Sequence, residues 1–194
     1  SAATVEMESI LITDFADDIV ENLKHNVSIN KSHLKCDVRV EQLDWRTAAC
    51  AEDVQYLYGR GNNDWADVIL AADCIYSEDI HIPLVKCIET LMKARLALSK
   101  VTQQGAIEPE KGPGVEFCRQ YEPMAILCCE ERGITTYDHF LHVVDSTKGV
   151  EMLEITDWAL TATDSRRLFP YEGRDRLRFI QIRLNLERNR REEP

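Results

Sequence analysis

An unbroken apolar run, Val68 to Ala72, is the feature that most constrains how this chain can fold. A run of this length without polar alternation predicts a strand covered on both faces, as in the parallel sheet of an α/β protein. The run stops at Asp73. In open α/β sheets the ligand crevice lies beyond the carboxyl ends of the strands. Asp73 therefore either lines a ligand site or caps the next helix, and the run alone leaves both possibilities open.

Strand-like and helix-like segments alternate along the chain. The apolar patterning predicts further strands at 8–15, 36–45 and 124–132, and helices at 16–30, 83–98 and 135–146. The apolar face of the first helix is expected to contain Phe15, Ile19, Leu23 and Val27. This order indicates a mostly parallel sheet with helices packed on it.

Two closing segments, 150–160 and 175–184, follow each other without a long helix between them. They predict an antiparallel hairpin at one edge of the sheet. The second segment is expected to alternate through Leu177, Phe179, Ile182 and Leu184. We therefore expect a single domain at 1–187, with a Gly- and Pro-rich loop at 99–117 and a charged tail at 188–194.

Charge and cysteine usage exclude several classes of protein. The formal net charge is −11, which argues against a surface that binds nucleic acid, because phosphate affinity needs clustered Lys and Arg. The seven cysteines include no CxxC pair and favour free thiols in a reducing, intracellular compartment, the nucleus or the cytoplasm. No apolar run is long enough to cross a membrane. His139 and His142 lack further ligands at suitable spacing, so we expect no metal site.

Three successive predicted strands end in an acid: Asp14, Asp44 (followed by Trp45) and Asp73. In nucleotide-binding α/β folds, a carboxylate at an early strand end typically accepts hydrogen bonds from ribose hydroxyls. Trp45 offers a flat aromatic face that suits an adenine ring, although for a lone Trp plain core packing is the favoured explanation. Asp14 could cap the following helix in addition.

The ordered series "ILITDFADDIVENLKHNVSIN", "LDW", "ADCIYSEDIHIPLVKCIETLM" and "CCEERG…YDHF" resembles the seven-strand S-adenosylmethionine-dependent methyltransferases. More narrowly, it is similar to family sixteen of the methyltransferase-like protein-lysine methyltransferases, whose D-x-x-Y motif matches Asp73 to Tyr76. The segments "YDHF" and "LFPYEGRDRLRFIQIRL" most resemble the branch that contains methyltransferase-like protein twenty-two. The resemblance covers nearly the whole chain except 99–117.

The resemblance implies roles for five residues. Asp14 would bind the ribose hydroxyls of S-adenosylmethionine, and Asp44 and Trp45 would contact its adenine. Asp73 and Tyr76 would line the methyl-transfer end, where the target lysine enters. The resemblance also implies a Rossmann-like sheet of strand order 3-2-1-4-5-7-6, with strand 7 antiparallel. The expected substrate is a protein with a basic, lysine-bearing segment, and we expect a monomer that binds neither nucleic acid nor membrane.

The chain departs from that pattern at its start. The glycine-rich loop that should hold the methionine part of the cofactor would lie before Ser1, together with strand 1. Loss of a central strand leaves two unpaired edges, so we expect these residues alone to form no stable, active enzyme. Two alternatives therefore remain: a non-catalytic methyltransferase-like scaffold, and a different nucleotide-binding enzyme such as a dehydrogenase.

Overall fold

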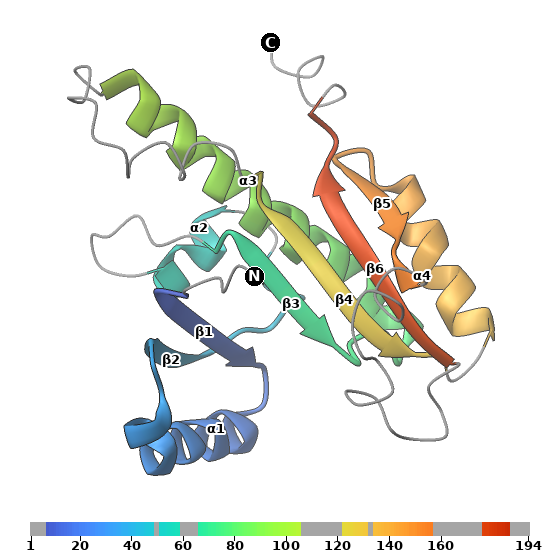
Figure 1. The fold of residues 1–194 in the computed structure, drawn as a ribbon. Helices are drawn as coiled ribbons and strands as arrows, with labels where there is room; N and C mark the ends of the chain where they lie inside the picture. Colours follow the sequence, from blue (N-terminus) through green and yellow to red (C-terminus); the bar gives the residue numbers. More distant parts are fainter. Residues whose placement is uncertain are drawn as a thin grey trace, which may run out of the picture.

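The computed structural model describes residues 7–48, 51–58, 66–105, 122–131, 134–156 and 176–186. Within these ranges the chain forms a mixed α/β fold (Figure 1). The strands are β1 (Ser9–Asp14), β2 (Asp37–Gln42), β3 (Val68–Ala72), β4 (Met124–Glu130), β5 (Val150–Glu154) and β6 (Leu177–Leu184). The α-helices are α1 (Asp17–Asn30), the short α2 (Ala51–Val54), α3 (His81–Gly105) and α4 (Ile134–Ser146). Short 3₁₀ turns lie at η1 (Lys31–His33), η2 (Gln55–Tyr58) and η3 (Glu78–Ile80).

The strands form two sheets. β1 and β2 make a parallel pair, and the second sheet has the order β3-β4-β6-β5. In this second sheet β3 runs parallel to β4, whereas β6 is antiparallel to both β4 and β5. The antiparallel closing pair expected from the sequence is therefore present. A single sheet of seven strands is not confirmed, since the described residues form six strands in two sheets and do not pair β1 with β3.

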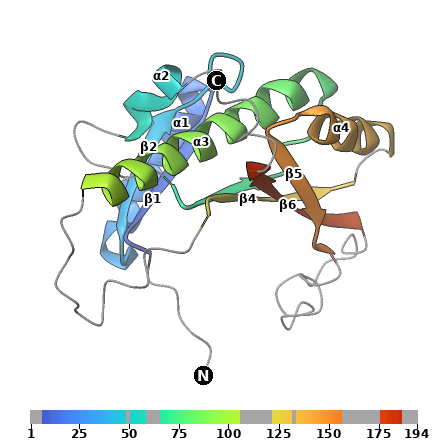
Figure 2. The ribbon, with the colours of Figure 1, turned by 90° about the horizontal axis from the view of Figure 1, so that it is seen from above.

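Both long helices of the larger sheet lie on the same side of it, as Figure 2 shows for α3 and α4. When successive right-handed crossovers move across a sheet in the same direction, their helices lie on the same face of that sheet. The core lies between these helices and the sheet, where Leu127, Phe140 and Ile180 are almost completely buried. The opposite face of β3 is open in the described part of the chain, with Val68 47% and Leu70 76% exposed. The expectation that β3 is covered on both faces is wrong for these residues.

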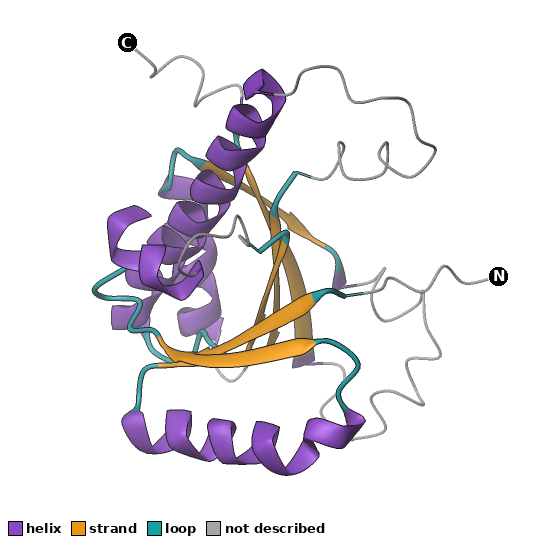
Figure 3. Ribbon diagram, turned by 90° about the vertical axis from the view of Figure 1, so that its left-hand side faces the viewer, coloured by secondary structure: helices purple, strands orange, loops and turns teal. Residues whose placement is uncertain are grey.

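Helix α1 lies along the two-stranded sheet, apart from α3 and α4 (Figure 3). Its span agrees with the sequence, but its expected core face does not, because Phe15 and Ile19 are exposed and Val20 is the residue it buries. A helix beside only two strands can bury only a narrow strip. Asp14 does not cap this helix: the N-cap position is Ala16, and no side chain there makes a capping hydrogen bond.

Other boundaries differ from those read off the sequence. Helix α3 continues to Gly105, so 99–105 is helical rather than loop. The rest of the expected loop, 106–117, and the tail at 188–194 lie outside the described residues, as does 157–160 of the expected strand. In β6 the buried alternation runs through Ile180, Ile182 and Leu184. Phe179 points to the other face, because successive side chains of a strand alternate.

Phe140 offers a test of this core, because its side chain is fully buried among residues of the larger sheet. We expect Phe140→Ala to lower the free energy of unfolding by about 3–5 kcal/mol, through lost apolar burial and the cavity that remains. Ile82→Ala, at an exposed position of α3, is the matched control and should cost less than about 1 kcal/mol. Urea unfolding of both variants measures the difference, and equal losses would contradict the described packing.

Candidate functional site

The carboxyl ends of β1, β2 and β3 lie near one another. The arrows of β1 and β3 point the same way in Figure 1, and β2 is parallel to β1. The pKa of the Cys74 thiol is raised to about 11, mainly by burial and in addition by the carboxylates of Asp73 and Asp14. Both charges therefore act on one thiol, although the two acids are far apart in sequence. The structure thus brings the ends of β1 and β3 to one edge.

The end of β2 reaches the same edge through Arg46. Hydrogen bonds to the carboxylate of Asp44, together with its charge, raise the pKa of this guanidinium, and the charge of Asp79 contributes as well. Arg46 also stands over the ring of Phe15, with its Cζ 5.7 Å from the ring centroid. Residues that follow three different strands therefore surround Arg46, a residue that the strand-end argument missed. Its position two residues after Asp44, at a strand end, is the signal that could have identified it.

Asp14 is held in place by short backbone contacts. Its Oδ1 accepts a hydrogen bond from the Ala16 amide at 3.1 Å, and its carbonyl accepts one from the Leu43 amide at 2.9 Å. In the described part of the chain no group donates a hydrogen bond to its Oδ2. The half-buried carboxylate is therefore oriented by the protein and keeps an oxygen for a ligand hydroxyl.

Asp44 and Trp45 are more committed to the protein itself. Both carboxylate oxygens of Asp44 accept hydrogen bonds from the Arg46 side chain at 2.9–3.2 Å, and the Arg46 amide adds a third donor at 3.0 Å. These hydrogen bonds lower the pKa of Asp44, so the carboxylate is ionised at neutral pH. Trp45 is half-buried and packs against both apolar clusters of the core. Any ligand contact that Trp45 makes is therefore additional to a packing role.

Asp73 has an unusual backbone conformation. Its φ is +55°, and its amide donates a 2.7 Å hydrogen bond to the Cys128 carbonyl of β4. Asp tolerates this left-handed region better than most residues, and such conformations cluster at functional sites. Ser77, not Asp73, occupies the N-cap position of the next helical turn. The capping explanation for Asp73 is therefore wrong, and the turn directs the chain to the exposed Tyr76.

A small cavity of about 120 Å³ opens beside this turn. Its walls come from the loop after β3, the end of β4 and the first turn of α4. The side chains that line it are Asp73, Ile75, Tyr76, Glu130, Glu131, Thr136 and Tyr137. Of these residues, only Asp73 and Tyr76 were expected from the sequence. Glu130 and Glu131 close β4 just as Asp73 closes β3, so their place at a strand end is the signal that could have identified them. Thr136 and Tyr137 lie on α4 and have no such signal.

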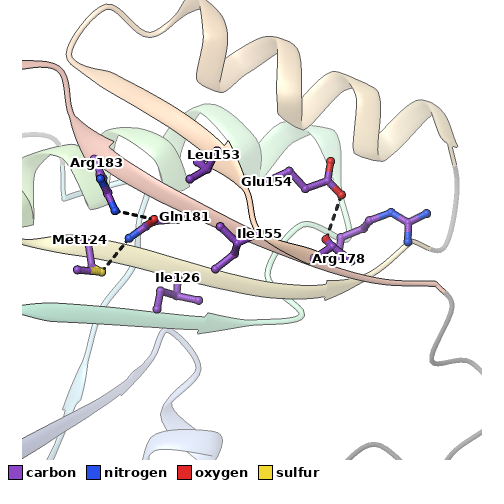
Figure 4. Close-up of a pocket in the computed structure, with 9 residues that line it drawn as sticks. Met124, Ile126, Leu153, Glu154, Ile155, Arg178, Gln181 and Arg183 are labelled. Carbon is purple, nitrogen blue, oxygen red and sulfur yellow. Dashed lines mark hydrogen bonds between the residues drawn. The ribbon is translucent and has the colours of Figure 1, made fainter. Parts of the chain in front are cut away.

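A larger hollow of about 1230 Å³ lies on the face of the sheet that α3 and α4 leave open (Figure 4). Met124, Ile126 and Leu153 line it together with polar side chains of β6. Gln181 bridges the strands there, since its Nε2 donates to Met124 Sδ at 3.0 Å and its Oε1 accepts from Arg183 Nη2 at 3.0 Å. No site residue expected from the sequence lines this hollow, so the candidate site is the strand-end edge.

A pair of histidines supports the loop that carries Tyr76. His81 is fully buried, and its Nδ1 lies 2.8 Å from Nδ1 of His139 on α4. Its Nε2 lies 3.4 Å from the carbonyl of Ile75, the residue before Tyr76. With both rings neutral, His139 can donate to His81 and His81 can donate to Ile75. Protonation of both rings would set two N–H groups against each other.

No group of three or more His, Cys, Asp or Glu among the described residues could hold a metal ion. The described cysteines at 36, 74, 87, 128 and 129 are free thiols. No helix in the described ranges is long and apolar enough to span a bilayer.

The histidine pair predicts a pH-dependent stability. Burial lowers the pKa of His81 below its ordinary value, aided by His139 and opposed by the Ile75 carbonyl, Glu78 and Asp79. Because the folded state favours the neutral ring, its stabilisation is complete above the unfolded pKa of about 6.5 and is lost as the pH falls through the folded pKa. We expect the melting temperature to fall between about pH 7 and pH 5, and to fall less steeply in His81→Phe.

His142→Gln is the matched control for this experiment, because His142 lies on the same helix as His139 but is exposed. It should keep the pH dependence of the wild type. If the melting temperatures of wild type and His81→Phe change in parallel across this pH range, His81 does not account for the pH dependence.

Comparison with known proteins identifies the relationship of this chain. A family model described as lysine methyltransferase matches residues 1–104, which is more than half of the 194 residues. The matched part includes β1, β2, β3 and each of Asp14, Asp44, Trp45, Asp73 and Tyr76. A search of curated proteins finds no match. The match over more than half of its length shows that this chain belongs to the lysine methyltransferase family.

Proposed function

We propose that this protein transfers a methyl group from S-adenosylmethionine to the side chain of a lysine in a protein substrate. Family membership supports the methyl transfer. The observation that carries the proposal is the meeting of three strand ends: the Leu43 amide after β2 donates to the Asp14 carbonyl of β1, Arg46 stands over Phe15, and β3 ends in the same direction as β1 (Figure 1). A cofactor with a ribose, an adenine and a reactive sulfonium needs contacts from several adjacent strands, and this edge offers them.

The residues at the edge fit the nucleoside part of the cofactor unevenly. Asp14 suits the ribose, because its carboxylate is oriented by Ala16 and has an oxygen available within the described structure. Asp44 suits the adenine less directly, since an adenine amine would have to share oxygens that Arg46 already engages. Trp45 offers only the part of its ring that the core leaves exposed. Asp14 is therefore the residue on which we expect cofactor affinity to depend most.

S-adenosylmethionine, when bound, supplies a methyl group on a positively charged sulfur. The protein has to bring a neutral lysine amine into line with that methyl group, and such positioning can account for most of a rate enhancement. Asp73 and Tyr76 line the cavity where the amine would enter. Asp73 can hold the ammonium as it arrives, and desolvation in the cavity lowers the pKa of the lysine so that it loses its proton.

The proposed substrate is a protein with a basic, lysine-bearing segment. The net charge of −11 favours encounter with a basic segment of a substrate protein. We propose a monomeric, intracellular enzyme. Its closing segments support a place in the branch of methyltransferase-like protein twenty-two.

We also propose that one further strand, from a segment that precedes residue 1, pairs between β1 and β3 and carries the glycine-rich cofactor loop. In the described residues β1 pairs with β2 alone and β3 with β4 alone. Such a strand would complete the order 3-2-1-4-5-7-6 that the family resemblance implies.

The added strand has a measurable consequence. A chain extended upstream by its own preceding residues should melt cooperatively at a higher temperature than residues 1–194 and bind S-adenosylmethionine, because two strand edges gain backbone partners. Calorimetric melting and cofactor titration of both chains measure this. Equal stability and equal affinity would contradict the added strand. A stable extended chain that does not bind the cofactor would favour the non-catalytic scaffold.

Asp14→Ala tests the function itself. We expect it to weaken S-adenosylmethionine binding at least about 10-fold in titration calorimetry, because hydrogen bonds to a carboxylate are lost. Asp18→Ala is the matched control, since Asp18 is an exposed acid nearby in the first turn of α1. It should leave the affinity unchanged.

The same wild-type protein, incubated with cell proteins and methyl-labelled cofactor, should place the label in methyllysine after acid hydrolysis. Asp73→Ala should abolish this labelling. Label in another amino acid, or cofactor affinity that is equal in Asp14→Ala and wild type, would contradict the proposal.

A further inference from the structure

Tyr137 stands out at the small cavity beside Asp73. It lies in the first turn of α4, and its side chain is 8% exposed. Its Oη is buried and has no hydrogen-bond partner among the described residues. Buried hydroxyl groups in native proteins almost always have a partner. Tyr137 is also one of the residues that line the small cavity. A buried, unpaired hydroxyl on a residue of the cavity wall suits a hydrogen-bond partner that comes from outside the chain.

We propose that Tyr137 is a substrate-binding residue, whose Oη forms a hydrogen bond with the amine of the lysine that is methylated. This inference rests on the proposed function, and it adds a contact from α4 to the site that Asp73 and Tyr76 begin.

The size of the cavity suits a lysine side chain. At about 120 Å³ it is somewhat smaller than a cavity of about 150 Å³ that holds one benzene molecule. A lysine side chain has fewer non-hydrogen atoms than benzene and is slender, so its amine end fits. Ile75 provides an apolar wall for the methylene chain. The aromatic rings of Tyr76 and Tyr137 can attract a cation through their faces.

The acids around the cavity favour a cationic group over an anionic one. Three carboxylates line it, those of Asp73, Glu130 and Glu131. Glu130 Oε1 lies 2.7 Å from Arg176 Nη2, and Glu131 forms an ion pair with Arg178, so arginines of the chain itself partly balance this negative charge.

The phenol of Tyr137 is in the right protonation state for this contact. Burial raises its pKa above the ordinary range, and the charge of Glu154 raises it further. The hydroxyl therefore stays neutral at physiological pH. A neutral phenol can accept a hydrogen bond from an ammonium N–H and can also donate one to a neutral amine. The phenol can therefore form a hydrogen bond with the lysine nitrogen both before and after the nitrogen loses its proton.

The test is a titration of the full-length protein with n-butylammonium chloride, a minimal mimic of the lysine side chain. The protein carries carbon-13 in the tyrosine ring carbon that bears the hydroxyl, and Tyr137→Phe assigns the signal of Tyr137. We expect n-butylammonium to shift this signal and n-butanol not to. Tyr137→Phe should bind n-butylammonium at least about 10-fold more weakly than wild type.

Tyr56→Phe is the matched control, because Tyr56 is exposed and its hydroxyl donates to the Gln42 carbonyl at 2.7 Å, away from the cavity. It should bind n-butylammonium like wild type. We also expect Tyr137→Phe to melt no lower than wild type, since it removes a hydroxyl that the free protein does not satisfy.

An unmoved Tyr137 signal, equal binding by wild type and Tyr137→Phe, or an equal shift with n-butanol would overturn the proposal. If Tyr137→Phe fails to fold, Tyr→Phe variants of the other five tyrosines assign the signal of Tyr137 by elimination, and the wild-type titration then decides the matter. Calorimetry with S-adenosylmethionine on the same sample separates this inference from the function on which it rests. Cofactor binding without a response of Tyr137 overturns the inference alone, whereas an amine response without cofactor binding overturns the proposed function.

Discussion

The parallel pairing of β3 with β4 is the interaction on which both the core and the candidate site depend. The ladder runs from Val68 opposite Met124 to Ala72 opposite Cys128. It ends with the amide of Asp73 bonded to the Cys128 carbonyl at 2.7 Å. Because this register aligns the two strand ends, the turn after β3 stands beside the acids that close β4. A slip of one strand by one residue would turn the buried side chains of that strand to the open face.

Two features of this edge do not contribute to the stability of the folded protein. Asp73 has a positive φ, and the hydroxyl of Tyr137 has no partner in the described part of the chain. Each is unfavourable in isolation, and each persists because the surrounding packing holds it. The neighbouring core supplies that packing, since Phe140 and His81 meet edge to face with ring centroids 5.4 Å apart. Strain and an unpaired polar group at the same small cavity are what a binding site requires and a purely structural turn does not.

Charge is arranged differently at the two ends of this edge. At the end of β2, Arg46 engages Asp44 through its side chain and its backbone amide, so that carboxylate is largely satisfied. At the end of β1, Asp14 is oriented by a single amide and keeps an oxygen available within the described residues. The two acids looked equivalent as strand-end carboxylates. The structure separates them into one that mainly supports a turn and one that suits a ligand.

Much of this could be read from the sequence, and local patterning is the reason. Apolar runs and helical periodicity depend on neighbouring residues, so they located β1, β2, α1, β4 and α4 and the acids at the strand ends. Only the tertiary structure decided which faces are covered. It left Leu70 exposed and put Phe179 on the opposite face from Ile182, because coverage depends on which side the crossover helices lie. It also decided the pairing of His81 with His139 and the meeting of Tyr137 with Asp73. These contacts join residues 58 and 64 positions apart, and no local pattern encodes such distances because the sheet register sets them.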